Sequence, residues 1–226
     1  MNEIKHFKNN IILILIIIVI TIMIVNLGGC LQEDIKLDNV EIREYQGAKL
    51  SSVNDFRENS IKGPQFITNE NYSLKITGLV QPMLNLSYDT IINNFNHYKK
   101  LVTLHCVEGW SVKILWEGVL IKDLLELTNI SPNASVIIFH AYDGYTTSLP
   151  IDYIIENNII ISFKMNNVTL PQERGFPFQL VAESKWGYKW IKWITEIELS
   201  DNEFYEGYWE RRGYSNIADL NNSFFD

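Results

Sequence analysis

An almost uninterrupted apolar run at residues 11–25 constrains the fold most, because it separates the first thirty residues from any folded body. Lys5 and Lys8 precede this run, and Leu27-Gly28-Gly29-Cys30 follows it. A basic start, an apolar core of this length and small residues before a cysteine are typical of a secretory leader. The sequence therefore predicts that residues 1–30 are a leader or a membrane anchor.

Cys30 has two interpretations. Small residues before a cysteine resemble a lipoprotein cleavage box, so that Cys30 becomes the lipid-bearing first residue of the mature protein. Alternatively, the apolar run is an uncleaved anchor helix with Cys30 just outside the membrane. Both interpretations predict the same location: the extracytoplasmic face of the cell membrane, with the chain tethered through its N-terminus.

The exported part has to fold around a hydrophobic core, because its single cysteine after Cys30, Cys106, has no partner for a disulfide. We expect a polar spacer at residues 31–54, one domain at 55–215 and a tail at 216–226. The whole chain carries a net charge of −8, and Glu3, Lys5 and Lys8 add +1 in the leader, which leaves −9 on the rest. Such an acidic body argues against a nucleic-acid partner.

Hydrophobic periodicity indicates an α+β architecture with mixed β-sheets and short helices. Asn166-Asn167 predicts a tight hairpin turn. Strands are expected at residues 72–77, 101–107, 112–116, 135–142, 159–165, 178–182 and 193–199, and helices at 89–95, 121–127 and 150–156. Because the helices do not alternate regularly with the strands, a doubly wound parallel sheet is not expected.

Cys106 stands in the segment 103–111, which reads Thr-Leu-His-Cys-Val-Glu-Gly-Trp-Ser. A lone thiol in an exported domain is either a small buried core residue or a chemical group. His105 and His140 lie within apolar strands and show no spacing typical of a zinc or non-haem iron site. The flanking Val-Glu-Gly-Trp-Ser favours a chemical role for the thiol of Cys106.

The order and spacing of several motifs resemble the molybdopterin-binding domain of the sulfite oxidase family, including its periplasmic methionine-sulfoxide reductase branch. The resemblance covers residues 55 to 215. The motifs are LHCVEGWS at 104–111, DGYTTSLP at 143–150, MNNVTLP at 165–171 with GFP at 175–177, KWGYKWIKW at 185–193 and GYWERRGY at 207–214.

The resemblance implies a molybdenum-molybdopterin cofactor with Cys106 as the metal ligand. A thiolate is a soft ligand that suits such a metal, and the pterin supplies two further sulfurs. The family's cofactor contacts correspond to the segment holding Lys185, Gly187, Lys189 and Lys192. An exposed basic turn is the alternative for these lysines.

Further positions follow from the same resemblance. Tyr145 occupies the place of an active-site tyrosine, or it is a turn residue packed on its own loop. Arg174 is a candidate for a phosphate contact, and Asn59 with Arg57 resembles the family's Arg-Asn-His element without its histidine. The family commonly has His-Gly where this chain has Arg174-Gly175, and Arg where it has Gln179.

Two functions are therefore expected to compete. In the first, the chain is an oxidoreductase that transfers an oxygen atom to or from a small substrate. The sequence has no Cys-x-x-Cys-His haem motif, so electrons pass to or from a separate redox partner, for which a membrane haem protein is a candidate. In the second, the chain is a cofactor-free lipoprotein of the same fold, a binding or assembly module. Gln179, Arg174 and a leader without an Arg-Arg pair favour the second, whereas Cys106 with the three lysines opposes it, and the first is the function that we expect.

Overall fold

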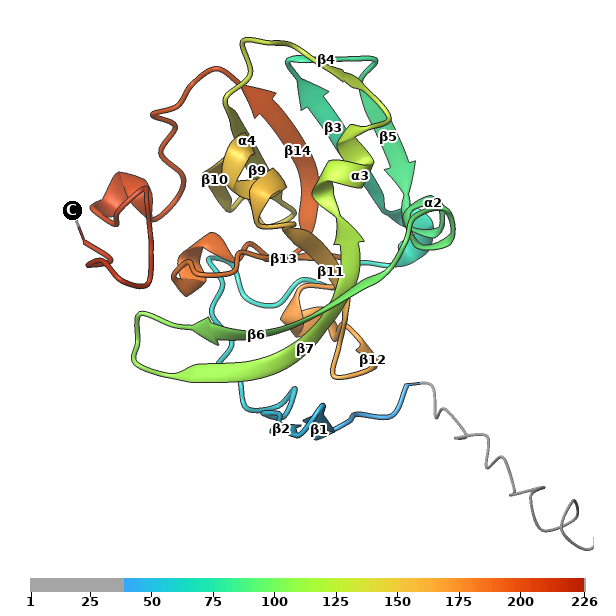
Figure 1. The fold of residues 1–226 in the computed structure, drawn as a ribbon, viewed down its shortest axis with the longest axis vertical. Helices are drawn as coiled ribbons and strands as arrows, with labels where there is room; N and C mark the ends of the chain where they lie inside the picture. Colours follow the sequence, from blue (N-terminus) through green and yellow to red (C-terminus); the bar gives the residue numbers. More distant parts are fainter. Residues whose placement is uncertain (1–38, 226) are drawn as a thin grey trace, which may run out of the picture. The chain divides into compact units, whose positions relative to one another are not determined.

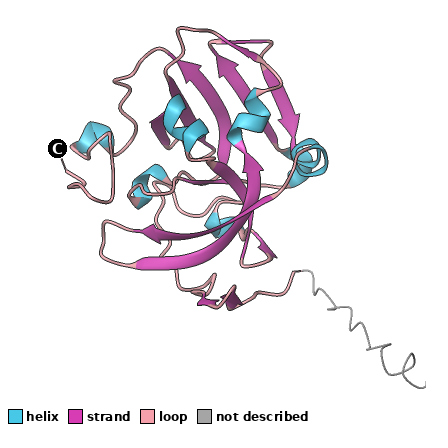
Figure 2. Cartoon of the chain, in the orientation of Figure 1, coloured by secondary structure: helices cyan, strands magenta, loops and turns pink. Residues whose placement is uncertain are grey.

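Two β-sheets make up most of the body in the computed structural model, which describes residues 39–225 (Figures 1 and 2). The leader, Cys30 and the first part of the expected spacer lie outside these residues. Within residues 39–225, no helix combines the length and the apolar character needed to cross a membrane.

The first sheet has the strand order β10-β9-β14-β3-β5. Strand β14 pairs in parallel with β3 and antiparallel with β9, so the sheet is mixed. Its members are β3 (Ser73–Gly78), β5 (Leu84–Ser87), β9 (Val136–Ala141), β10 (Thr146–Pro150) and β14 (Ile194–Ser200).

The second sheet has the order β12-β11-β7-β6, and β13 also pairs with β11. Strands β6 and β7 form a long hairpin (Figure 1). The members are β6 (Tyr98–His105), β7 (Ser111–Leu120), β11 (Ile160–Met165), β12 (Val168–Thr169) and β13 (Gln179–Val181). Two small pairs complete the strands: β1 (Glu44–Tyr45) with β2 (Ala48–Lys49), and β4 (Val80–Gln81) with β8 (Asn129–Ile130).

Helices are short, and all except η4, which follows the last strand, lie between strands (Figure 2). The α-helices are α2 (Tyr88–Asn94), α3 (Ile121–Leu125) and α4 (Ile151–Glu156). The 3-10 helices are η1 (Asn69–Asn71), η2 (Gln172–Arg174), η3 (Gly187–Lys189) and η4 (Glu210–Arg212). Helix α2 begins where the Ser87 hydroxyl accepts a hydrogen bond of 3.1 Å from Thr90 N, which satisfies one of its free N–H groups.

The expected strands and helices are all present, with shifted ends. Asn166 and Asn167 have φ values of +47° and +70°, which confirms the tight turn, here between β11 and β12. Strands β1, β2, β4, β5, β8, β10 and β12 were not expected, because short strands carry little periodicity of their own. Side chains from both sheets, such as Trp116, Phe139 and Phe163, belong to one buried core.

Two expected boundaries are corrected. Residues 39–54 are not a free spacer, since Ile42 N donates to Asn166 O at 3.0 Å and Leu50 is buried in the body. The end of the chain is not a free tail either. Trp186 N donates to Ala218 O at 2.9 Å, so backbone hydrogen bonds tie the last residues to the segment that begins at Lys185.

Candidate functional site

Cys106 lies in the loop that joins β6 to β7, one residue beyond the end of β6. Its N–H donates to Trp110 O at 2.9 Å, and its own carbonyl accepts from Gly109 N at 3.1 Å. Gly109 has φ +86°, a conformation that glycine adopts without steric cost, and this closes the tight loop. The strand expected at 101–107 ends at His105, and in the loop that follows Val107 lines the same cavity as Leu104 and Cys106.

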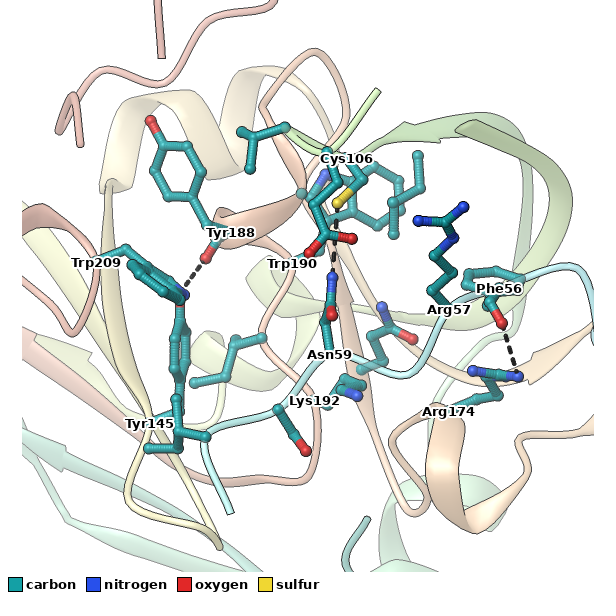
Figure 3. A pocket seen from close by; sticks show the side chains of 18 of the residues that line it. Phe56, Arg57, Asn59, Cys106, Tyr145, Arg174, Tyr188, Trp190, Lys192 and Trp209 are labelled. Atoms are coloured by element: carbon teal, nitrogen blue, oxygen red, sulfur yellow. Dashed lines mark hydrogen bonds between the residues drawn. The ribbon is translucent and has the colours of Figure 1, made fainter. Parts of the chain in front are cut away.

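A cavity of about 260 Å³ opens beside the Cys106 thiol, which is free and half-buried (Figure 3). Aromatic side chains form much of its wall. They are Phe56, Trp110, Tyr145, Tyr188, Trp190, Trp193, Trp209 and Tyr214. The cavity is also lined by the charged or polar residues Arg57, Asn59, Ser60, Glu108, Asp143, Glu173, Arg174, Gln179 and Lys192. A thiol at the edge of an open, largely aromatic cavity fits a ligand role better than a core role.

The pKa of the Cys106 thiol is raised, chiefly because burial disfavours the thiolate. Hydrogen bonds from the Glu108 backbone and from Asn59 offset part of this rise. Asn59 Nδ2 lies 3.7 Å from Cys106 Sγ (Figure 3). The free thiol therefore keeps its proton at neutral pH, and metal binding has to displace that proton.

Gly187 lies against the Cys106 loop. A Cβ atom at this position would lie 3.1 Å from His105 O and 3.5 Å from Cys106 Cα. His105 and Trp186 also form an isolated parallel bridge. The absence of a side chain at Gly187 thus allows η3 to approach the loop closely, and Gly187 lines the cavity.

The three lysines predicted to bind the cofactor do not stay together. Lys192 lines the cavity and donates to Glu58 Oε1 at 2.9 Å. Lys185 instead pairs with Asp219 at 2.5 Å, and Lys189 pairs with Glu210 at 2.6 Å. Neither Lys185 nor Lys189 is among the residues that line the cavity. The structure therefore brings one of the three ammonium groups to the site.

Arg174 and Asn59 both lie at the cavity (Figure 3). Arg174 Nε donates to Val53 O at 3.1 Å, its Nη2 donates to Phe56 O at 3.3 Å, and its guanidinium lies 5.1 Å from the centre of the Phe56 ring. Burial lowers the pKa of Arg174 from its ordinary value, but a guanidinium stays charged at neutral pH. Arg174 thus holds the segment that carries Asn59.

Tyr145 lines the cavity, and its hydroxyl donates to Tyr188 O at 2.5 Å. Its N–H donates to Asp143 Oδ1 at 2.9 Å, which fixes the turn. Burial, followed by the nearby Glu210 carboxylate, raises the pKa of Tyr145 well above its ordinary value. The phenol is therefore neutral, and it can donate to a substrate only if it leaves Tyr188.

Sequence reasoning assigned no role to Glu58, Trp209 or Tyr214. Glu58 is the partner of Lys192, and the two aromatic residues form part of the cavity wall. Trp209 and Tyr214 belong to the motif GYWERRGY, so the motif was the available signal. Nothing in the sequence pairs Glu58 with Lys192, because 134 positions separate them.

Among residues 39–225, no group of three or more His, Cys, Asp and Glu side chains is arranged to hold a metal ion.

Residues 61–209 match the family described as the oxidoreductase molybdopterin binding domain. The chain belongs to this family. The recognition made from the sequence motifs, the sulfite-oxidase-type fold, the molybdenum-molybdopterin cofactor and the class of molybdenum-dependent oxidoreductase are thereby confirmed.

Three similar proteins illustrate the relationship. The "uncharacterized oxidoreductase YuiH" of Bacillus subtilis is 33% identical over 144 residues, which are 63% of this chain and 72% of YuiH. The protein-methionine-sulfoxide reductase catalytic subunit MsrP of Gluconobacter oxydans is 28% identical over 58% of this chain and 48% of its own. The solved structure of the sulfane dehydrogenase SoxCD from Paracoccus pantotrophus has a TM-score of 0.61 at 19% identity, covering 67% of this chain and 42% of that chain, and it shows the fold alone.

The residues at the cavity fit the family's cofactor. Cys106 offers a soft sulfur donor at an accessible wall, and a metal that brings two pterin sulfurs needs few protein ligands. Lys192 and Arg174 provide positive charge for an anionic cofactor, and Gly187 leaves room for close backbone approach. Gln179, where the family commonly has an arginine, lies buried at the same cavity and supplies no charge.

Proposed function

We propose that the protein is a membrane-tethered, extracytoplasmic oxidoreductase that transfers an oxygen atom to or from a small substrate in the cavity beside Cys106. The observation that carries this proposal is the position of Cys106, whose free, half-buried side chain lines an open cavity that Lys192 and Arg174 also line. When bound, the molybdenum cofactor supplies two-electron oxygen-atom transfer.

The chain's own residues then have separate tasks. Cys106 holds the metal through its sulfur, and Asn59 orients that sulfur by its amide. Lys192 and Arg174 attract the anionic part of the cofactor. Trp110, Trp190 and Trp209, among others, form the aromatic part of the wall, which a bound substrate would contact. Tyr145 is the candidate to contact the substrate oxygen.

The name of the Gluconobacter relative supports two further parts of the proposal. A methionine-sulfoxide reductase removes an oxygen atom from sulfur, so reduction of a small sulfoxide is the direction to assay first. That relative is named a catalytic subunit, which supports a separate redox partner, and a membrane haem protein is the candidate. The tether rests on the apolar run 11–25 and on Cys30.

Metal and pterin analysis of the protein purified from its native host tests the proposal. We expect close to one molybdenum per chain, lost in Cys106→Ser while the melting temperature of the variant stays near that of the cofactor-free protein. The loaded protein should also reduce methionine sulfoxide with a reduced viologen dye as electron donor. A native protein without molybdenum and pterin contradicts the proposal and favours the cofactor-free module. An unmodified Cys30 that is still joined to residues 1–29 would contradict a lipid on Cys30 as the form of the tether.

A further inference from the structure

We propose that Glu210 is a positioning residue of the cavity: through Lys189 it fixes the segment that faces Cys106. The inference deepens the function proposed above and rests on it. It concerns two residues outside the cavity lining, one of which the sequence assigned to the cofactor itself.

Lys189 and Glu210 form a buried ion pair, with side chains 0% and 1% exposed. Lys189 Nζ donates to Glu210 Oε1 at 2.6 Å, to Asn216 Oδ1 at 2.9 Å and to Ser148 O at 3.1 Å. An ammonium group has three donors, so these acceptors use all of them and define the direction of the side chain. Thr147 Oγ1 also donates to Glu210 Oε1, at 2.6 Å.

The cluster joins three parts of the chain that lie far apart in sequence. Thr147 and Ser148 belong to β10, Lys189 ends η3, and Glu210 begins η4. A second pair acts at the other end of the same segment, because Lys185 Nζ donates to Asp219 Oδ1 at 2.5 Å and to Ile217 O at 2.8 Å. The segment 185–189 is thus anchored at both ends by the C-terminal part of the chain.

The anchored segment forms one wall of the site. Gly187, two residues before Lys189, lies against His105 and Cys106. Tyr188, adjacent to Lys189, accepts the hydroxyl hydrogen of Tyr145 through its backbone carbonyl. A displacement of η3 would therefore move the boundary of the cavity at the metal ligand and the candidate catalytic phenol together.

Stability alone does not account for the cluster. Burying two charges is expensive, and well-packed apolar residues often serve stability as well as a buried ion pair does. Glu210 Oε2 is also buried without a hydrogen-bond partner among the described residues, which is a further cost. The cluster supplies directional bonds instead, and such bonds hold a site in one geometry.

Three variants of the full chain test the proposal. Glu210→Gln keeps the shape but removes the charge. The double variant Lys189→Met, Glu210→Leu removes both charges and the directional bonds while filling similar volume. Ile76→Ala, in the buried core at β3 and outside both the cluster and the cavity lining, is the control for lost stability. The alkylation rate of Cys106 by iodoacetamide is followed by mass spectrometry of its peptide, in protein made without pterin synthesis and well below each melting temperature.

We expect Cys106 to react several-fold faster in Glu210→Gln and in the double variant. This should hold although the melting temperature of the double variant is closer than that of Glu210→Gln to the value for the protein without substitutions. In loaded protein, both variants should release molybdenum and pterin about tenfold faster, the lower end of what loss of an outer contact costs a metal site. Ile76→Ala should have a lower melting temperature, with no change in the rate of Cys106 alkylation or in the rate of cofactor release. The proposal is overturned if the double variant alkylates and releases its cofactor at the same rates as the protein without substitutions. This holds whether or not Glu210→Gln folds.

The two proposals fail separately. If the native protein holds no molybdenum, the proposed function fails, while the alkylation rates of the cofactor-free variants still decide the positioning role of Glu210. If the native protein holds molybdenum and the variants react and release like the unmodified chain, only the positioning role fails.

Discussion

Lys192 Nζ lies 2.9 Å from Glu58 Oε1, so the lysine that reaches the cavity is already paired with a carboxylate from the segment holding Asn59. Glu58 is partly buried, which by itself opposes ionisation, yet the hydrogen bond and charge of Lys192 lower its pKa from the ordinary value. For Lys192, burial outweighs the pair and lowers the pKa. The hydrogen bond between Glu58 and Lys192 connects residues 55–61 to the end of the motif KWGYKWIKW.

This pair predicts a pH dependence of stability. Because the folded protein lowers the pKa of Glu58, its contribution to the free energy of unfolding is complete above the ordinary value of 4.5 and is lost as pH falls through the lower folded value. Glu58→Gln should lose stability at pH 7 and show a smaller decrease between pH 5 and pH 3. Urea unfolding at several pH values measures this, and parallel pH curves for both proteins would contradict it.

Gly187→Ala should disturb the contact between η3 and the Cys106 loop. The new Cβ would lie 3.1 Å from His105 O, so we expect a loss of about 1–3 kcal/mol in the free energy of unfolding and a reduced molybdenum content. Gly118→Ala is the comparison, since its Cβ would lie 2.1 Å from Ile161 O and should cost more stability. Unchanged molybdenum content in a folded Gly187→Ala would show that the close contact is not needed for the cofactor.

Tyr145→Phe tests the candidate catalytic phenol. The ring stays, while the hydrogen bond to Tyr188 O disappears, so the free energy of unfolding should fall by about 1 kcal/mol. We expect retained molybdenum, a lower kcat and a smaller change in KM, as for a group that acts on the reacting oxygen. Steady-state kinetics with metal content measured in parallel decide this, and an unchanged kcat removes Tyr145 from the catalytic residues.

Asn166→Ala should weaken the attachment of residues 39–54. The buried Asn166 amide donates to Ser51 O at 2.7 Å and accepts from Leu115 N at 3.1 Å. Each buried group left without its partner costs about 1–3 kcal/mol, and alanine also disfavours the φ of +47°. Asn167→Gly, the next residue in the same turn, loses the exposed hydrogen bond from Asn167 Nδ2 to Val40 O at 3.3 Å but suits the φ of +70°, so it should cost less. Thermal unfolding of both variants checks the order, and equal losses would contradict it.

Much of the local structure could be predicted from residue patterns. The apolar segments that form β9 and β11, the short helix α2 and the Asn166-Asn167 turn depend on neighbours within a few positions, and each is found close to where it was expected. Short strands such as β1 and β8 escaped prediction, because their partners alone define them. The same limit applies to the attachment of residues 39–54 and of residues 216–225 to the body, because that attachment depends on backbone groups far away in the sequence.

The sequence by itself determined the family, the motif around Cys106 and the presence of three lysines near a glycine. Only the tertiary structure decided what those lysines do. Lys185 and Lys189 turn to Asp219 and Glu210, which lie 34 and 21 positions further along the chain, while Lys192 faces the cavity. The reason is physical: a buried ammonium needs a carboxylate, and chain folding, not local spacing, determines which carboxylate lies within reach.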